Sequence, residues 1–123
     1  MGKTIKELVA SATAYATRQG FYDEGWNVPA KLDAIIGEVK EAHAAYAELR
    51  VRISVIGWVG WIYYHDRPGQ EPVPDGFGIE LADIVLRVCS LAGKLGIDLD
   101  EMIRIKQAHN ESRPHLHGKS NPQ

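Results

Sequence analysis

Four carboxylates occur in two pairs of equal spacing, within segments that are otherwise largely apolar. Glu38 and Glu41 lie three residues apart in IIGEVKEAH, and Glu80 and Asp83 have the same spacing in IELADIVLRV. Two like charges about 4 Å apart repel by about 4 kcal/mol at an effective dielectric of about 20, so four converging carboxylates need a cation. Oxygen ligands suit a hard divalent ion, which favours Mg²⁺, with Mn²⁺ as the second choice.

A structural explanation of the same acids stays open at this level. Asp83 and Arg87 are four residues apart and could pair along a solvated helical stripe. Iron is the competing metal, because helical bundles also hold it with carboxylates. Such sites need a histidine three residues after a glutamate, whereas His43 is only two residues from Glu41. Magnesium is therefore the favoured ion if the carboxylates converge.

A set of basic and amide side chains follows near the C-terminus. Lys106, Asn110 and Arg113 stand at positions i, i+4 and i+7 and would share one face of a helix. An ammonium, an amide and a guanidinium together suit a phosphate group. The alternative is that basic residues near a helix C-terminus only interact with its dipole. Beside a carboxylate metal site, phosphate binding is the favoured interpretation.

Aromatic residues and histidines are further candidates for a site. Phe21 and Trp26 lie in the segment FYDEGWN and could stack on a nucleobase, although aromatic clusters more often belong to a core or a subunit interface. Three histidines near the C-terminus match no common zinc spacing and are expected to be solvated. They are His109, His115 and His117.

Helices must position these residues. Apolar residues recur at helical spacing in four segments, and capping residues, glycines and Pro114 mark their ends. The third segment is apolar around most of its circumference and is expected to be buried. Four helices without a convincing set of strands predict an all-α fold, a four-helix bundle-type domain. The predicted helices cover residues 4–20, 29–50, 79–95 and 98–113.

The connector between the second and third helices, residues 51–78, is the least regular part of the chain. Apolar residues alternate over 51–55 as in a strand, whereas aromatic residues over 58–64 are spaced as on a helix, and neither structure is favoured. The second half is rich in proline and glycine and is predicted to be a loop. The polar tail, residues 114–123, is expected to be loose.

Length and composition predict one domain in a reducing compartment. The chain has 123 residues and a formal net charge of -2 with interspersed signs, so neither polymeric nucleic acid nor a membrane is an expected partner. Cys89 is the only cysteine and falls in the most apolar helix, which excludes an internal disulfide and favours a core position. No segment has the pattern of a signal peptide or a membrane span, and we expect a cytoplasmic protein.

Several motifs occur together along the chain. ExxE is followed by ExxD, then GxDL, then KxxxNxxRP with HG behind it, within GFYDEGWNVPAKLDAIIGEVKEAHAAY and PDGFGIELADIVLRVCSLAGKLGIDLDEMIRIKQAHNESRPHLHGK. In this combination the chain resembles the MazG-like nucleotide pyrophosphohydrolases. These belong to the all-α NTP pyrophosphatase superfamily, with the dimeric dUTPases and dCTP pyrophosphatases. The first half of the connector has no counterpart in the family.

The resemblance implies a magnesium-dependent enzyme that hydrolyses a nucleoside triphosphate, of ribose or deoxyribose, to the monophosphate and pyrophosphate. It also implies a homodimer or homotetramer. A carboxylate, Glu38 or Glu41, would orient the attacking water. The implied metal ligands are Glu38, Glu41, Glu80 and Asp83. The implied phosphate ligands are Lys106, Asn110 and Arg113.

Two other functions fit the same pattern. One is a metal-dependent hydrolase of another phosphorylated metabolite, since the carboxylates and the basic residues specify only a phosphate. The other is a helical interaction module without catalytic activity, in which the acids would form a solvated stripe.

Overall fold

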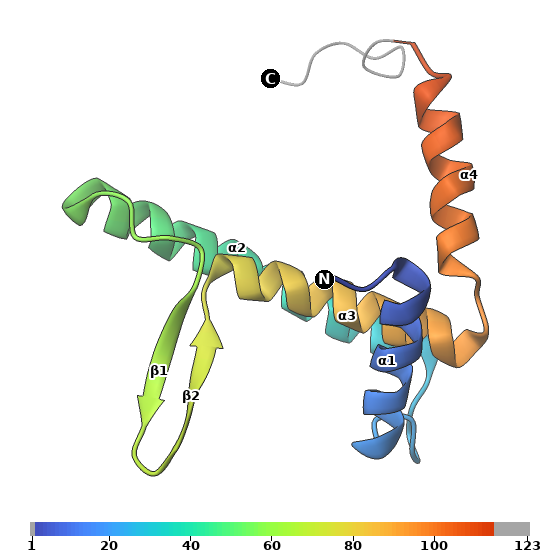
Figure 1. Cartoon of the computed structure of the whole chain (residues 1–123), viewed down its shortest axis with the longest axis horizontal. Helices are drawn as coiled ribbons and strands as arrows, with labels where there is room; N and C mark the ends of the chain where they lie inside the picture. The colour runs from blue at the N-terminus through green and yellow to red at the C-terminus, as the bar shows by residue number, and fades with distance from the viewer. Residues whose placement is uncertain (1, 115–123) are drawn as a thin grey trace.

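The structure, a computed structural model, describes residues 2–114 and consists of four helices and one two-stranded antiparallel sheet (Figure 1). The sequence predicted an all-α, four-helix bundle-type domain; its mainly helical character is confirmed, whereas the small sheet was not expected. In chain order the elements are α1 (Ile5–Arg18), α2 (Val28–Ile56), β1 (Tyr63–Arg67), β2 (Gln70–Asp75), α3 (Phe77–Leu95) and α4 (Leu99–Glu111).

The predicted helix ends agree with the capping groups. The Glu7 amide donates to Thr4 Oγ1 at 3.1 Å, while Glu7 Oε1 accepts from the Thr4 amide at 2.9 Å, which completes a capping box. Gly96 ends α3 in the left-handed conformation, with φ 69°. Asp98 caps α4 by accepting from the Glu101 amide at 3.1 Å. Local sequence therefore fixes where three of the helices begin or end.

The connector differs from the sequence prediction in both halves. Its first residues are helical, since α2 continues to Ile56, and the loop predicted for the second half is wrong because β1 and β2 form a hairpin there. Pro72 and Pro74 lie within β2 and lack an amide donor, but each strand of a two-stranded sheet has a free edge where no donor is needed. Gly69 adopts φ 72° between the two strands.

Helices α2 and α3 lie side by side and run in opposite directions (Figure 1). Near one end of the pair, the ring of Tyr46 lies 5.3 Å from the ring of Phe77. Further along, Arg87 Nη2 lies 3.0 Å from Glu38 Oε1. The two helices are therefore antiparallel, and Glu38 on α2 lies opposite Asp83 and Arg87 on α3.

Helix α1 packs on the C-terminal half of α3, where Gly93 allows a close approach. A Cβ atom at Gly93 would lie 2.9 Å from Thr13 Cβ and would overlap Thr13 Oγ1. The loop after α1 is fixed to the same part of α3, because the Tyr22 hydroxyl donates to the Ser90 carbonyl at 2.6 Å. Lys94 Nζ lies 5.2 Å from the centre of the Tyr22 ring.

The buried core of the single chain is small. Cys89 is buried as predicted, and it is the largest side chain below 2 % exposure in the part described. The expectation that α3 is buried nearly all round is wrong for one chain, because Leu81 and Val85 are 47 % and 48 % exposed. No helix between residues 2 and 114 combines the length and the apolar character needed to cross a membrane.

Helix α4 extends away from α2 and α3, and its main contact is with α1 (Figure 1). None of its residues is buried, and Met102 and Ile105 are 46 % and 56 % exposed. The four helices therefore do not close into a four-helix bundle within one chain.

Candidate metal centre

Three of the four predicted metal ligands come together between α2 and α3. Glu38 projects from α2, and Glu80 and Asp83 project from successive turns of α3. Each offers a carboxylate oxygen, and these oxygens all lie within 4.8 Å of one another. The i, i+3 spacing places Glu80 and Asp83 on one face of α3, and the antiparallel packing supplies Glu38 to that face.

Glu38 is the most constrained member of this carboxylate cluster. It is only 9 % exposed, and its Oε2 atom is buried without a hydrogen-bond partner in the described part of the chain. A hydrogen bond with Asp83 and burial raise the pKa of Glu38 to about 7, although Arg87 opposes the shift. A proton shared with Asp83 or a bound cation would satisfy this carboxylate, since each removes the charge that burial disfavours.

Glu80 is partly buried at the hairpin side of the cluster. Burial raises the pKa of Glu80 above its usual value, and the negative charges of Glu41, Asp75 and Asp83 raise it further. The side chain of Asp75 is held by two donors. Its Oδ2 lies 2.8 Å from His65 Nε2, and its Oδ1 accepts from the Gly76 amide at 2.7 Å. These bonds keep a fourth negative charge beside the cluster.

Arg87 is the counterion of the cluster. Its Nη2 atom lies 3.0 Å from Glu38 Oε1, and its Nε atom lies 3.4 Å from Asp83 Oδ2. The Asp83 to Arg87 pair expected for a solvated stripe is therefore present, but it is not solvated on the Glu38 side. If all three carboxylates are ionised, three negative charges and one positive charge leave two negative charges, which one divalent cation would neutralise.

Glu41, the remaining predicted ligand, lies outside the three converging carboxylates. It is exposed on α2, one turn beyond Glu38, yet it is close enough for its charge to raise the pKa of both Glu38 and Glu80. Its role as a direct ligand stays a prediction.

The predicted phosphate ligands are not brought to the carboxylates within one chain. Lys106 and Asn110 are exposed on α4, and Arg113 lies just beyond its end. Since α4 contacts mainly α1, these residues stand apart from the seam of α2 and α3 (Figure 1). The structure places His109 on exposed α4, whereas His115 and His117 lie outside the described residues.

An open groove of about 360 Å³ lies next to the carboxylates and contains both predicted aromatic residues, Phe21 and Trp26. Two cations that sequence reasoning missed as ligands, Lys31 and Arg87, also line it. A signal for Lys31 exists, because it precedes Glu38 by seven residues and two helical turns place both on one face of α2. Arg87 lines the groove and also pairs with the cluster, so the two features are continuous.

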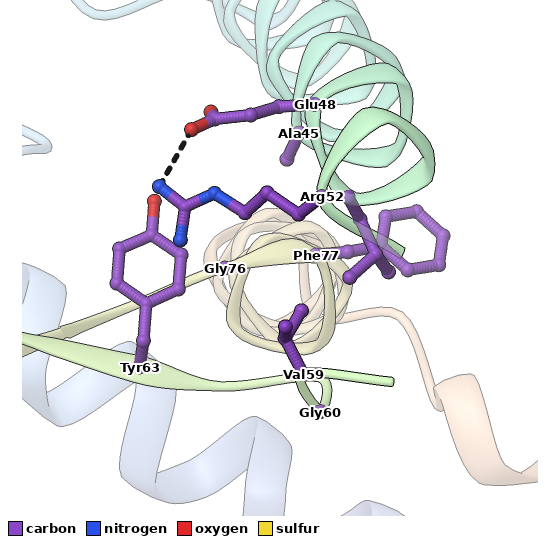
Figure 2. A pocket seen from close by; sticks show the side chains of 9 residues that line it. Ala45, Glu48, Arg52, Val59, Gly60, Tyr63, Gly76 and Phe77 are labelled. Atoms are coloured by element: carbon purple, nitrogen blue, oxygen red, sulfur yellow. Dashed lines mark hydrogen bonds and ion pairs between the residues drawn. The ribbon is translucent and has the colours of Figure 1, made fainter. Parts of the chain in front are cut away.

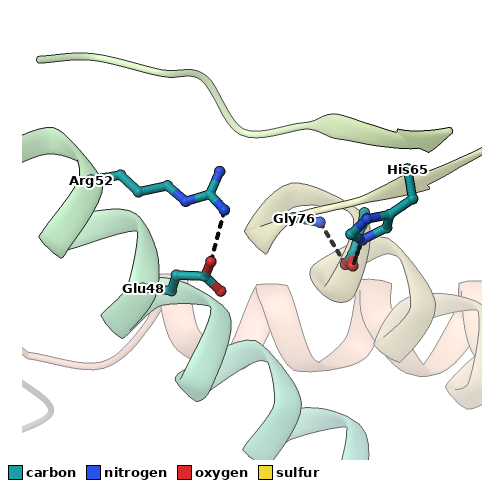
Figure 3. Close-up of polar contacts among 5 residues, drawn as sticks. Glu48, Arg52, His65 and Gly76 are labelled. Carbon is teal, nitrogen blue, oxygen red and sulfur yellow. Dashed lines mark hydrogen bonds and ion pairs between the residues drawn. The ribbon is translucent and has the colours of Figure 1, made fainter. Parts of the chain in front are cut away.

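A more enclosed cavity lies elsewhere, between the C-terminal half of α2 and the start of the hairpin (Figure 2). Its charged groups satisfy one another, since Arg52 Nη2 lies 2.8 Å from Glu48 Oε1 and the guanidinium lies 5.0 Å from the centre of the Tyr63 ring. Figure 3 shows this pair beside the His65 pair at the hairpin. The cavity has no unpaired buried polar atom among its lining residues, which distinguishes it from the carboxylate cluster.

Comparisons of the chain with protein-family models, with curated proteins and with solved structures found no match.

Proposed function

We propose that the protein is a magnesium-dependent nucleotide pyrophosphohydrolase, which converts a nucleoside triphosphate to the monophosphate and pyrophosphate. One observation carries the proposal. Three carboxylates from two helices lie within 4.8 Å of one another, and one of them, Glu38, is buried with an oxygen that has no partner among the residues described. The motif resemblance implies the substrate class, and the cluster supports the proposal because its three carboxylates could hold a metal ion.

The donor set fits a hard divalent cation. All three groups offer oxygen, and no histidine or cysteine belongs to the cluster in the part of the chain described. Mg²⁺ prefers such ligands, retains several waters and is usually completed by substrate phosphates. When bound, it would neutralise phosphate charge and lower the pKa of a coordinated water.

The residues of the chain would then position the reactants. With Glu38, Glu80 and Asp83 engaged, Glu41 keeps an exposed carboxylate one turn away that can accept a proton from the attacking water. The water oxygen forms a bond to the α-phosphorus, and the bond from that phosphorus to the bridging oxygen breaks, which releases pyrophosphate. If Glu41 is instead a ligand, Glu38 takes the role of base.

The second part of the proposal is a homo-oligomer. Leu32, Ile36 and Val39 follow helical spacing on α2 and are 46 %, 53 % and 50 % exposed, a stripe that a monomer has no reason to leave in water. A second copy that covers this stripe and the exposed face of α3 would complete a bundle of the all-α NTP pyrophosphatase kind. It would also bring Lys106, Asn110 and Arg113 of another chain to the phosphates.

A panel of nucleoside triphosphates with Mg²⁺, in which pyrophosphate and orthophosphate are measured separately, tests the activity. Equal amounts of pyrophosphate and monophosphate are expected for at least one nucleotide. Release of orthophosphate alone would contradict the proposal and favour a hydrolase of another phosphate ester. No turnover of any nucleotide or sugar phosphate would favour a non-catalytic module.

A further inference from the structure

The groove beside the carboxylate cluster has the composition of an anion site with an aromatic wall. It is lined by Phe21 and Trp26 from the loop after α1, by Lys31 from α2 and by Arg87 from α3. Its volume of about 360 Å³ falls within the range of small-molecule sites, roughly 300–1,000 Å³. A loop and two helices contribute to it, so the groove depends on the tertiary fold.

Lys31 is a cation without a fixed partner in the described part of the chain. It makes no ion pair within residues 2–114, although its side chain is only partly exposed. Burial lowers the pKa of Lys31 most, the neighbouring charge of Arg87 lowers it further, and the charges of Asp83 and Glu38 raise it. The ammonium therefore lies near Arg87 at the edge of the cluster.

Arg87 has donors left over after it has paired with the carboxylates. Its Nε and Nη2 atoms face Asp83 and Glu38, whereas no bond of Nη1 occurs in the described part of the chain. A guanidinium with one edge fixed by carboxylates is held in a defined orientation, and its other N–H groups suit an oxyanion. The pairing thus orients Arg87 for a ligand in the groove it lines.

Trp26 provides a second, independent sign of a missing partner. Its Nε1 atom is buried and has no hydrogen-bond acceptor among the residues described. The ring is held in place by Tyr22, at 5.8 Å between ring centres, and by Lys94 Nζ at 5.8 Å. Because Tyr22 is itself bonded to the Ser90 carbonyl of α3, the Trp26 ring is fixed relative to Arg87.

We propose that this groove is a nucleotide-binding subsite in which Lys31 and Arg87 hold a phosphate and the rings of Phe21 and Trp26 contact the base. The assignment rests on the proposed function for the identity of the ligand as a nucleotide. It differs from the phosphate set on α4, because all of its residues come from one chain. Arg87 links the two sites, since the same guanidinium touches the metal-binding carboxylates and the bound phosphate.

Calorimetric binding of a non-hydrolysable nucleoside triphosphate analogue to the full chain with Mg²⁺ tests the subsite. Lys31→Met should weaken binding about 10-fold, because a hydrogen bond to a charged group contributes that much. Lys40→Met, at an exposed lysine on the same helix, is the matched control and should bind like the wild type. Equal affinity of Lys31→Met and the wild type would overturn the proposal.

Arg87 is tested with two variants, because its loss leaves two carboxylates without a counterion. Arg87→Gln should weaken binding at least as much as Lys31→Met, and Arg87→Lys should recover part of it. Arg52→Gln removes another arginine that pairs with a glutamate, away from the groove, and should have no effect. If the Arg87 variants do not fold, Lys31→Met and its control Lys40→Met still test the subsite.

Two further ligands distinguish the contribution of the base to binding from that of the phosphate. Inorganic pyrophosphate should bind more weakly than the analogue and lose affinity in Lys31→Met, whereas the unphosphorylated nucleoside should bind most weakly and be indifferent to that change. Wild-type affinity and wild-type turnover in Lys31→Met would contradict the subsite and leave the proposed function standing. Analogue binding that depends on Lys31, in a protein without hydrolysis, would support the subsite and contradict the proposed function.

Discussion

The two halves of the predicted site differ in how far they are buried. The carboxylates lie in the contact between α2 and α3, which we call the seam, whereas the predicted phosphate ligands lie on or just beyond α4. In the seam, Glu38 is buried, meets two carboxylates and is paired with Arg87. On α4, by contrast, no residue is buried, and the helix contacts mainly α1. The carboxylates of neighbouring helices therefore meet within one chain, whereas the residues on α4 do not lie beside them.

The largest effect is expected in the seam itself. Glu38→Gln removes the buried negative charge, and it should lower turnover by more than about 100-fold, because even an outer-shell substitution typically costs 10–100-fold. Glu48→Gln makes the same change at an exposed position on the same helix and should stay within about 2-fold of the wild type. Steady-state pyrophosphate release measures both. Similar activity of the two variants would contradict a role of Glu38 and its neighbouring carboxylates in catalysis.

Mixing two inactive variants tests whether α4 acts on the carboxylates of another chain. Asp83→Asn and Lys106→Ala should each lack activity, but a dimer with one chain of each kind has one intact composite site if α4 acts on the other chain. Random exchange would then restore about a quarter of the wild-type turnover. Mixing after partial denaturation and refolding provides the exchange. No recovery, in a sample shown to be mixed by mass, would mean that α4 does not complete the site of its partner.

Alanine substitutions at two glycines compare a close contact between helices with an open helix surface. Gly93→Ala should destabilise the fold by about 1–2 kcal/mol, because the added methyl meets Thr13 on α1. Gly37→Ala, where nothing lies within 4 Å, should stabilise it by about 0.5–1 kcal/mol through helix propensity. Urea unfolding curves measure both changes. Destabilisation by Gly37→Ala would show that another chain covers this part of α2, and a neutral Gly93→Ala would contradict the packing of α1 on α3.

A further effect concerns pH and is specific to the carboxylates between α2 and α3. Because the pKa of Glu38 is raised from 4.5 to about 7, the folded state holds the proton more tightly than the unfolded state. This contribution to stability is present below about pH 4.5 and is lost as the pH rises through about 7. Without metal, the wild type should therefore lose stability over this range relative to Glu38→Gln, as measured by urea titration at several pH values. A difference between the two proteins that is constant with pH would contradict the raised pKa.

Helical periodicity explains why the acids of the seam could be predicted. The spacing of Glu80 and Asp83 puts both on one face of a helix whatever surrounds it, and consecutive helices usually pack together, which brought Glu38 to them. The groove was less accessible to sequence reasoning, because Lys31 and Arg87 meet only through the packing of α2 on α3. The Tyr22 bond to Ser90, which helps to orient Trp26, is also a contact between distant residues.

The connector shows where local patterns mislead. Alternating apolar residues at Val51 and Ile53 suit a strand, yet this segment continues α2, since about six turns of preceding helix favour its extension over a new element. Pro72 and Pro74 suit a loop, yet an isolated hairpin has free edges that accept them. In both places the neighbouring structure outweighed the preference of the residues.

Thermal unfolding with and without Mg²⁺, in wild type and in Asp83→Asn, tests the central claim most directly. Binding of Mg²⁺ to the three carboxylates should stabilise the wild type by about 2.7 kcal/mol at one hundred times the dissociation constant. Asp83→Asn should lose this response, while its stability in EDTA should equal or exceed that of the wild type, because one repelling charge is gone. A wild-type melting temperature that is the same in EDTA and in several concentrations of Mg²⁺, both alone and with the non-hydrolysable analogue, would contradict a metal site at these carboxylates.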